Sequence, residues 1–428
     1  MLVSLVPGPR EASDGPWCWR SMPTLSSRLS RLVVVAVAVF LVTACSGGAS
    51  DGGGNEAGGD PIVVGLINQE NAAAGSFPEV RTDAEAAVRY VNAELDGVGG
   101  RPIRLESCAT DGSRESSQAC ANQLRLKEPV AVLGGIDLGA AASIPVLASA
   151  GIPYVGSSPT LGDELTNSNA FMLTGGAAAD LLGQAQYITD VLRAEKVAVL
   201  YIDLPGLLST AVEAAKDVLG KKGVGDVKLV AEKADTADFT PALNDVNRGD
   251  PDVIVAVFPA QGCSRIMQAR EALSIDATIM FPGACAAQSV IDAAGGGAEG
   301  VIFASGFLPY DGSDPDVVTY RDKREEFGAE EPPSVLAQAG FGAVMDLREI
   351  LNDVVGELTP GTVTTALRVT KDHRGFMSHP FTCDRQQVFL LSAVCNNNVR
   401  LLQYGDGRFT DVANGWVNGA DLIRLFTS

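Results

Sequence analysis

Six cysteines fall into three pairs that are close in sequence and could form disulfide bonds. They are Cys108 and Cys120, Cys263 and Cys285, and Cys383 and Cys395. Because six cysteines can be joined in many ways, this local pairing is a hypothesis. The other chemistry open to them is metal binding, but no C-x-x-C spacing occurs, and His373 and His379 are the only histidines. We therefore expect disulfide bonds, an oxidising compartment and no metal site.

Motifs that would indicate catalysis do not appear in a suitable setting. No G-x-S-x-G run follows a predicted strand, as a nucleophile elbow requires. The one neighbouring acid and histidine, Asp372-His373, lie in a polar segment typical of a surface loop. No phosphate-binding loop occurs, and no G-x-G-x-x-G run follows a strand. We expect no enzyme and no cofactor.

The segment that ends at Cys45 resembles a bacterial lipoprotein signal. Arg28 and Arg31 precede an apolar run, 32–44, that is too short to span a bilayer as a stable helix. The run ends in small residues followed by Cys45, so the resemblance implies cleavage before this cysteine and a lipid on its sulfur. The alternatives are an ordinary signal peptide and a short membrane anchor. We expect a signal peptide over 1–44, with Met22 the more natural start, and a lipidated cysteine with a flexible tether over 45–59.

The charge and the length limit the partners and the architecture. The formal net charge is −20, with 52 acidic and 32 basic residues. Such a surface repels nucleic acid, so we expect no nucleic-acid partner. A chain of 428 residues is long enough for two separate cores. No long apolar run follows Cys45, so the lipid alone would hold the protein at the outer side of the cell membrane.

From residue 60 onward, short β-branched runs alternate with amphipathic helical stretches. In the first series we expect strands at 62–66, 103–107, 131–134 and 154–156, and helices at 80–95, 114–126 and 140–150. In the second we expect strands at 197–202, 227–231, 253–258, 278–281 and 301–304, and helices at 178–192, 208–221, 239–248, 264–273 and 288–294. Later helices are expected at 315–327 and 334–355, and closing β structure at 380–391 and 399–412. Repeated βαβ units predict two parallel sheets, each covered by helices.

Several segments, in order, are similar to those of a known family. They are 84–94 (AEAAVRYVNAE), 99–105 (GGRPIRL), 130–134 (VAVLG), 151–155 (GIPYV), 164–166 (ELT) and 238–243 (DFTPAL). This order and spacing resemble the extracytoplasmic solute-binding lipoproteins of ABC importers, of the branched-chain amino acid and amide type. The resemblance holds from about residue 60 to 308 and is looser beyond.

The resemblance implies an α/β fold of two doubly wound lobes, the type I periplasmic binding protein architecture of the Leu/Ile/Val-binding family. Three hinge crossings would join the lobes, with the ligand enclosed between them. The helices at 315–355 would then return to the first lobe. We expect lobe 1 to comprise 60–175 and 308–378, and lobe 2 to comprise 176–307 and 379–428.

Candidate ligand contacts in the first lobe lie at the carboxyl ends of predicted strands, where loops face the crevice and helix N-termini offer free N–H groups. By resemblance, Ile136, Asp137, Ser157, Ser158 and Thr160 match family positions that grip the ligand head group. Turn chemistry around Pro159 is an equal alternative for the two serines and Thr160. The loop with Gln69 is a weaker contributor, and Glu70 fits a solvated charge.

The second lobe departs from the amino-acid-binding pattern. Pro205, after Asp203, stands where the family commonly has a tyrosine, and Ala284 lies in a run without the family's acidic partner for the ligand ammonium. Either Asp203 or Asp137 replaces that acid, or the ligand lacks an α-amino group, which the sequence slightly favours. The ligand would then be an amide, a carboxylate or an aromatic acid. A bond between Cys263 and Cys285 would join two binding loops and hold Gln261 at the rim, unless both are buried thiols.

The resulting functional hypothesis is a lipid-anchored protein that captures a small polar ligand, whether an amino acid, an amide or a carboxylate. Its partners would be an ABC permease and the ATPase subunits of that permease. The main alternative is a ligand-sensing lipoprotein that signals to a membrane receptor or kinase. A structural envelope lipoprotein is the third possibility, and it would show no ligand-dependent stability.

Overall fold

The computed structural model describes residues 57–72, 75–160, 162–203, 208–233 and 236–427. The predicted signal peptide, Cys45 and most of the tether lie outside these residues, as does Pro205. For residues 208–211, 426 and 427, the backbone alone is described. Among the helices of the described part, none combines the length and apolarity needed to cross a bilayer.

The first sheet is parallel throughout and has the strand order β2-β1-β3-β4-β5. Its strands are β1 (Ile62–Gln69), β2 (Ile103–Thr110), β3 (Ala131–Gly134), β4 (Tyr154–Gly156) and β5 (Ala170–Met172). Its connecting helices are α1 (Pro78–Glu94), α2 (Arg114–Arg125), α3 (Ala140–Ser149) and α4 (Gly162–Thr166). Strand order reverses between β1 and β3, so the loops after these two strands border the crevice where such sheets bind ligands.

The second sheet is mixed, with the order β12-β11-β10-β9-β8-β6-β7 and β13 paired to β11. Its strands are β6 (Lys196–Ile202), β7 (Asp226–Glu232), β8 (Val253–Val257), β9 (Thr278–Phe281), β10 (Ile302–Ser305), β11 (Asn398–Gly405), β12 (Arg408–Asp411) and β13 (Val417–Asn418). Its helices are α5 (Gly176–Tyr187), α6 (Leu208–Lys221), α7 (Thr240–Asn247), α8 (Ala260–Leu273) and α9 (Gln288–Ala294). The strand order reverses between β6 and β8, which again places two loops at one crevice.

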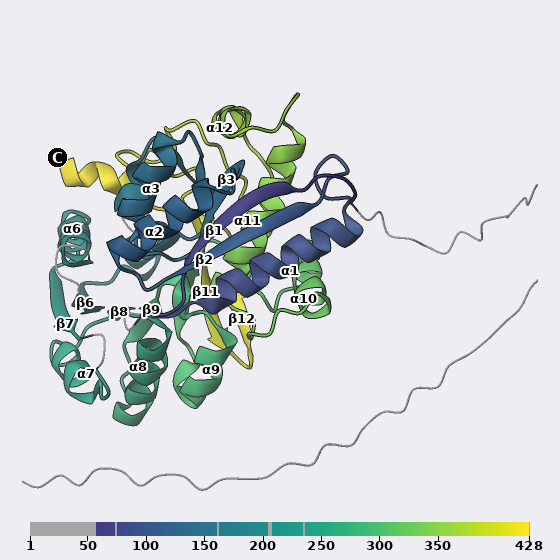
Figure 1. The fold of residues 1–428 in the computed structure, drawn as a ribbon. Helices are drawn as coiled ribbons and strands as arrows, with labels where there is room; N and C mark the ends of the chain where they lie inside the picture. The colour runs from purple at the N-terminus through teal and green to yellow at the C-terminus, as the bar shows by residue number, and fades with distance from the viewer. Residues whose placement is uncertain (1–56, 73–74, 161, 204–207, 234–235, 428) are drawn as a thin grey trace, which may run out of the picture. The chain divides into compact units, whose positions relative to one another are not determined.

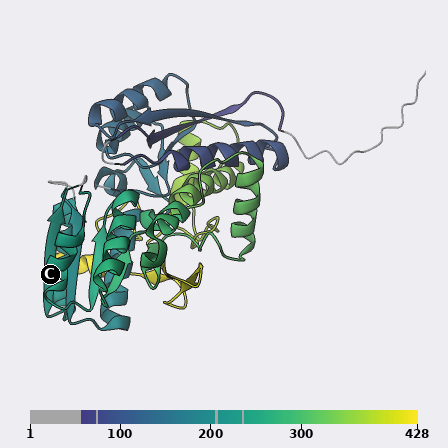
Figure 2. The ribbon, with the colours of Figure 1, turned by 90° about the horizontal axis from the view of Figure 1, so that it is seen from below.

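Three further helices follow the second sheet's parallel strands: α10 (Pro315–Glu326), α11 (Val335–Asn352) and α12 (Pro360–Val369). Both α10 and α11 lie beside α1 (Figures 1 and 2). Arg324 on α10 forms a buried bidentate ion pair with Asp83 on α1, with Nε–Oδ1 and Nη2–Oδ2 distances of 2.7 and 3.0 Å. The predicted return of this segment to the first sheet is therefore confirmed.

Most predicted elements match the structure, and the turn at 405–407 joins β11 to β12. The β structure predicted at 380–391 is wrong, because Arg385 and Leu390 adopt positive φ angles of 68° and 67°, which break an extended strand. Instead, Ala393 and Cys395 bond to the backbone of Met172 at the end of β5. The predicted lobe bounds stay a prediction.

All three predicted disulfide bonds are present: Cys108–Cys120, Cys263–Cys285 and Cys383–Cys395. The first joins β2 to α2, and the second joins α8 to the short 3₁₀ turn after β9, Gly283–Cys285. Each closes a short loop, which stabilises a fold by roughly 3 kcal/mol in the chain-entropy description.

Thiol titration tests this pairing directly. In the mature chain carrying Cys45→Ser, denatured without reductant, we expect no reactive thiol, because all six remaining cysteines are bonded. Treatment with reductant before the assay should release all six and serves as the control. Two or more reactive thiols in the unreduced sample would contradict the pairing.

Candidate functional site

Loops from both sheets line one cleft with a volume of about 160 Å³. From the first sheet come loops after β1, β3 and β4, and from the second come the ends of β6, β8 and β9, together with the first turns of α5 and α11. The lining residues are Phe77, Ile136, Leu138, Ser158, Pro159, Thr160, Ala177, Asp180, Ile202, Val257, Phe258, Pro259, Pro282, Ala284 and Leu336. These are the carboxyl ends of parallel strands, where open α/β sheets bind ligands.

The wall of the cleft is mostly apolar. Among the lining residues that the structure describes, only Ser158, Thr160 and Asp180 carry a hydroxyl or carboxyl group. A pocket of this kind buries an apolar ligand body, while its few polar groups fix the orientation.

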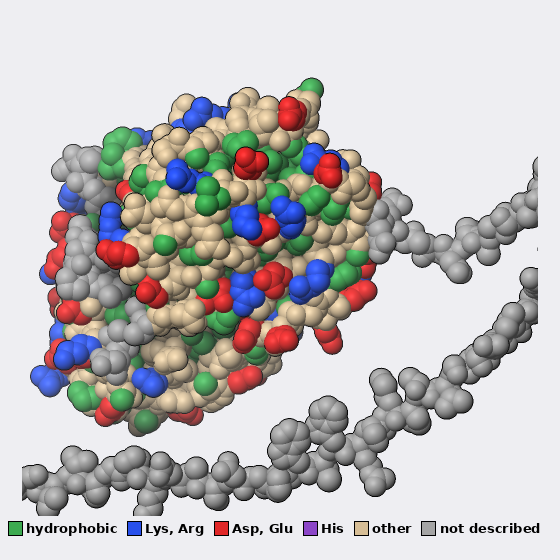
Figure 3. Space-filling view, viewed as in Figure 1, with side chains coloured by type: hydrophobic (Ala, Val, Ile, Leu, Met, Phe, Trp, Pro, Cys, Tyr) green, Lys and Arg blue, Asp and Glu red, His purple; other side chains and the backbone are tan. Residues whose placement is uncertain are grey.

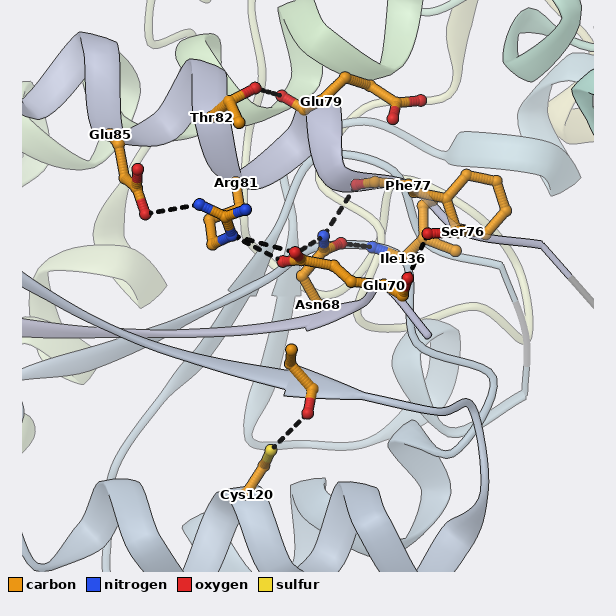
Figure 4. A network of polar contacts seen from close by, with 11 residues as sticks. Asn68, Glu70, Ser76, Phe77, Glu79, Arg81, Thr82, Glu85, Cys120 and Ile136 are labelled. Atoms are coloured by element: carbon orange, nitrogen blue, oxygen red, sulfur yellow. Dashed lines mark hydrogen bonds and ion pairs between the residues drawn. The ribbon is translucent and has the colours of Figure 1, made fainter. Parts of the chain in front are cut away.

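Two buried amides, those of Asn68 and Gln69, hold the first-sheet loops in place, and Figure 4 shows the first of them. Asn68 Nδ2 donates to the Phe77 carbonyl oxygen at 2.8 Å, and Asn68 Oδ1 accepts from the Ile136 backbone N–H at 3.2 Å. Gln69 Nε2 donates to the Gly75 carbonyl oxygen at 2.8 Å, and Gln69 Oε1 accepts from the Leu138 N–H at 3.2 Å. Gln69, predicted as a contact, is therefore a positioning residue that fixes Leu138, and it does not line the cleft.

The neighbouring charges on this side are paired with each other. Arg81 Nε lies 2.8 Å from Glu70 Oε1, and Arg81 Nη1 lies 3.0 Å from Glu85 Oε1 (Figure 4). Neither Glu70 nor Arg81 lines the cleft. The prediction of a solvated charge at Glu70 is wrong, because its side chain is only 12% exposed and is paired with Arg81.

Asp137 and Ser157 are buried away from the cleft lining. Asp137 accepts hydrogen bonds from the hydroxyls of Thr110 and Ser117 and from the Gly139 N–H. Burial raises the pKa of Asp137, and these donors oppose the shift. Because its oxygens are engaged inside the first sheet's layer, Asp137 is not placed to replace the missing acid.

Ser158 and Thr160 line the cleft, and their contact with a ligand stays a prediction. The Ser158 hydroxyl makes no hydrogen bond to another described residue. The backbone N–H and the hydroxyl of Thr160 both donate to Glu164 Oε2, at 2.9 and 3.1 Å. Ser158 is thus the first-sheet hydroxyl available to a ligand, and Thr160 is held by α4.

On the second-sheet side, the cleft is lined by Pro259, Pro282 and Ala284. The Cys263–Cys285 bond joins the two loops that carry these prolines, as expected. Asp203 and Gln261 are exposed and outside the lining.

Asp180, which no sequence pattern singled out, is the one carboxyl group among the described lining residues, and it is 6% exposed. It lies one turn into α5, and its Oδ2 accepts from the Gly283 N–H at 2.8 Å. Burial raises the pKa of Asp180 to about 7, and the Gly283 N–H opposes the shift. The sequence does hold a signal for this residue. Asp180 interrupts the apolar run 177–182 of a predicted helix, and an aspartate is seldom buried unless it has a partner.

The first turns of four helices reach the cleft. Phe77, Ala177, Pro259 and Leu336 lie at the beginnings of α1, α5, α8 and α11. Helix N-termini present unpaired N–H groups and partial positive charge, which suit the oxygen atoms of a ligand. Within the described residues, no cluster of three or more His, Cys, Asp or Glu side chains could hold a metal ion.

Residues 61–396 match the family described as periplasmic binding protein. No curated protein sequence matches the chain.

Solved structures share its fold at low sequence identity. One is the branched-chain amino acid transporter substrate-binding protein LivJ of Streptococcus pneumoniae in complex with isoleucine, with 21% identity, a TM-score of 0.65, and coverage of 82% of this chain and 98% of that one. A second is a solute-binding protein of an R. palustris ABC transporter in complex with 4-hydroxybenzoate, with 17% identity, a TM-score of 0.67 and coverage of 82% and 95%. A third is a fatty acid ABC transporter substrate-binding protein of Thermomonospora curvata, with 14% identity, a TM-score of 0.71 and coverage of 88% and 97%.

Proposed function

We propose, from the premise that this chain belongs to the periplasmic binding protein family, that it binds one small molecule in the cleft and delivers it to an ABC permease and its ATPase subunits. The family comprises extracytoplasmic solute-binding proteins of ABC transporters rather than enzymes. The observation that carries the proposal is the cleft itself, which is lined by the carboxyl ends of strands from both sheets.

The ligand class follows from the cleft's lining. An apolar body would contact Phe77, Leu336 and Phe258, while polar atoms would meet Ser158 and Asp180. Isoleucine, 4-hydroxybenzoate and fatty acids, which appear with the similar structures, all combine an apolar body with a polar head. The amino acid, amide and carboxylate classes expected from the sequence all have this build.

Ligand binding would favour a closed arrangement of the two lobes. A ligand that contacts Ser158 from one sheet and Ala284 from the other binds best when these residues are close. Such differential contact shifts a hinge equilibrium toward closure. A permease can then distinguish the loaded protein from the empty one by its shape.

We also propose that a lipid on Cys45 tethers the protein to the outer side of the membrane, beside its permease. Support for the anchor is the signal-like segment that ends at Cys45. A Cys45→Ser variant should move from the membrane fraction to the soluble fraction. Its retention in the membrane fraction would contradict the anchor and leave the ligand-binding proposal intact.

A thermal-shift screen tests the binding function. Amino acids, amides, short carboxylates, aromatic acids and amines are each added to the purified protein. A saturating ligand stabilises the native state by several kcal/mol, so at least one compound should raise the melting temperature by several degrees. If no compound of any class raises it, the proposed function is wrong.

Removing the Ser158 hydroxyl should weaken ligand binding without unfolding the protein. One uncompensated hydrogen bond contributes about 0.5–1.5 kcal/mol, so Ser158→Ala should raise the Kd of the screened ligand roughly threefold to tenfold. The matched control is Ser149→Ala, at an exposed serine outside the cleft, which should leave the Kd unchanged. Equal Kd values for the wild type and both variants would remove Ser158 from the binding site.

A further inference from the structure

A second cavity lies along α5, on a different side of this helix from the cleft. It has a volume of about 220 Å³, and all ten described residues that line it are aliphatic. Ala177 and Asp180 of α5 line the cleft. Four other residues of α5 line the second cavity: Ala178, Leu181, Leu182 and Ala185. Helical geometry puts these four on one side of α5 and the two cleft residues on another, so α5 separates the two spaces. We call the second space the α5 cavity.

Elements packed on both sheets form the walls of the α5 cavity. On one side are Leu165 of α4, which packs against β5, and Leu391. The segment with Leu391 is attached to α4, because the Ala393 N–H donates to the Leu165 carbonyl oxygen at 2.9 Å. On the other side are α5, α6 and Ile423 of the 3₁₀ segment Ala420–Thr427, which pack against one another beside the second sheet. A molecule that fills the cavity therefore contacts elements that belong to different sheets.

The lining of the α5 cavity determines what it can hold. Leucine, alanine, valine and isoleucine side chains carry no hydrogen-bonding group, so water there lacks the polar partners that an ordered water needs. A charged group would lose its hydration without gaining a partner. An engineered cavity of about 150 Å³ with a similar lining stays dry and binds benzene. The α5 cavity therefore suits an uncharged apolar molecule of this size or slightly larger.

The size of the α5 cavity excludes a larger partner. Its volume of about 220 Å³ is below the roughly 300–1,000 Å³ of pockets for drug-sized ligands, so a helix or strand of another protein does not fit. On the face shown in Figure 3, hydrophobic side chains are interspersed with acidic and basic ones, as on an ordinary surface. Ten aliphatic side chains around one hollow are a different arrangement, which favours a small apolar ligand.

We propose that the α5 cavity is a second binding site, which takes a small uncharged hydrocarbon, and that this occupant strengthens ligand binding in the cleft. The strengthening rests on the proposed function. In the structure the cleft is lined from both sheets, so this arrangement of the lobes lets one ligand contact both walls. A hydrocarbon that contacts both walls of the α5 cavity favours the same arrangement. By linkage, each ligand then raises the affinity of the other by the same factor, about fivefold or more.

Titration calorimetry with benzene tests the cavity. Because the cleft is also largely apolar, it is first blocked with Ala284→Trp, and the cavity is then filled with Ala215→Phe on α6. We expect one benzene to bind to Ala284→Trp and none to Ala215→Phe/Ala284→Trp. The matched control is Ala284→Trp/Ala293→Phe, at an exposed alanine of α9, which should bind benzene as Ala284→Trp does. Benzoate should not bind to Ala284→Trp, because the cavity excludes charge.

Xenon provides a measurement that needs no variant. In crystals of the wild type under xenon pressure, we expect a bound atom in the α5 cavity, in contact with Leu181 and Leu391. This result would locate the site even if Ala215→Phe did not fold.

The coupling is measured with the strongest ligand of the thermal-shift screen. In the wild type, saturating benzene should lower the Kd of this ligand by about fivefold or more. In Ala215→Phe, where the cavity is filled, benzene should leave the Kd unchanged. Melting curves of all variants confirm that any loss of binding reflects the site and not the fold.

Equal benzene binding by Ala284→Trp and Ala215→Phe/Ala284→Trp overturns the inference, and so does xenon bound only outside the α5 cavity. A cleft-ligand Kd that benzene raises or leaves unchanged in the wild type also overturns it, and the proposed function then stands. If no compound of the screen binds in the cleft, the proposed function fails, while the benzene titration still decides whether the cavity is a binding site.

Discussion

Replacing Arg324 by methionine is expected to lower the free energy of unfolding by about 3–5 kcal/mol. The substitution leaves Asp83 on α1 without its bidentate partner, in a position where the Asp83 side chain is 0% exposed. It also removes the bond from Arg324 Nη2 to the Glu331 carbonyl oxygen. Because Arg324 attaches α10 to α1, its loss weakens the return of the chain to the first sheet.

Urea denaturation of the wild type and three variants measures this effect. Arg408→Met, at an exposed arginine on β12, should change the free energy of unfolding by no more than about 0.5 kcal/mol. The double variant Asp83→Leu/Arg324→Met removes both charges and should recover much of the stability that Arg324→Met loses. A loss below about 1 kcal/mol in Arg324→Met would show that the pair does not hold the two helices together.

The second large effect concerns stability and pH. The pKa of Asp180 is raised from 3.8 to about 7 by burial, so the folded protein binds this proton more tightly than the unfolded chain does. The resulting stability is fully present below about pH 4 and is lost as the pH rises through 7. At about 1.4 kcal/mol per pKa unit, the loss in the unliganded protein has an upper limit of roughly 4 kcal/mol.

Asparagine at position 180 cannot ionise and keeps an acceptor for the Gly283 N–H. In the unliganded state, Asp180→Asn should therefore equal the wild type in stability near pH 4 and exceed it increasingly up to pH 7–8. Urea denaturation at a series of pH values measures the difference. A variant that is less stable than the wild type at pH 8 would show that the ionised carboxylate is stabilised in the empty cleft.

The fold could be predicted from the sequence because strands buried on both faces of a parallel sheet appear as continuous apolar runs. The continuous apolar runs at 131–134 and 278–281 mark β3 and β9 with the bounds seen in the structure. The short edge strand β5, by contrast, has only three residues, and its neighbour α4 has five, too few for a periodic signal. The family resemblance inferred from the ordered segments is confirmed.

The site residues were harder to predict, because the position of a residue at a strand end does not determine the direction of its side chain. Ile136, Ser158, Thr160 and Ala284 line the cleft, whereas Asp137, one residue after Ile136, is bonded inside the layer. Asp180 escaped notice because it belongs to a helix rather than to a loop after a strand. Its role depends on the contact with Gly283, a residue 103 positions away in sequence, which no local pattern encodes.

One small molecule is expected to bind in the cleft between the two sheets. Titration calorimetry of the wild type and of Ala284→Trp with the strongest ligand of the screen tests it most directly. Ala284 lines a cleft of about 160 Å³, so a tryptophan there would occupy the ligand space. We predict one ligand per wild-type protein and no measurable binding to a folded Ala284→Trp variant. Equal affinity for both proteins would rule out the cleft as the binding site, because the ligand would then bind elsewhere.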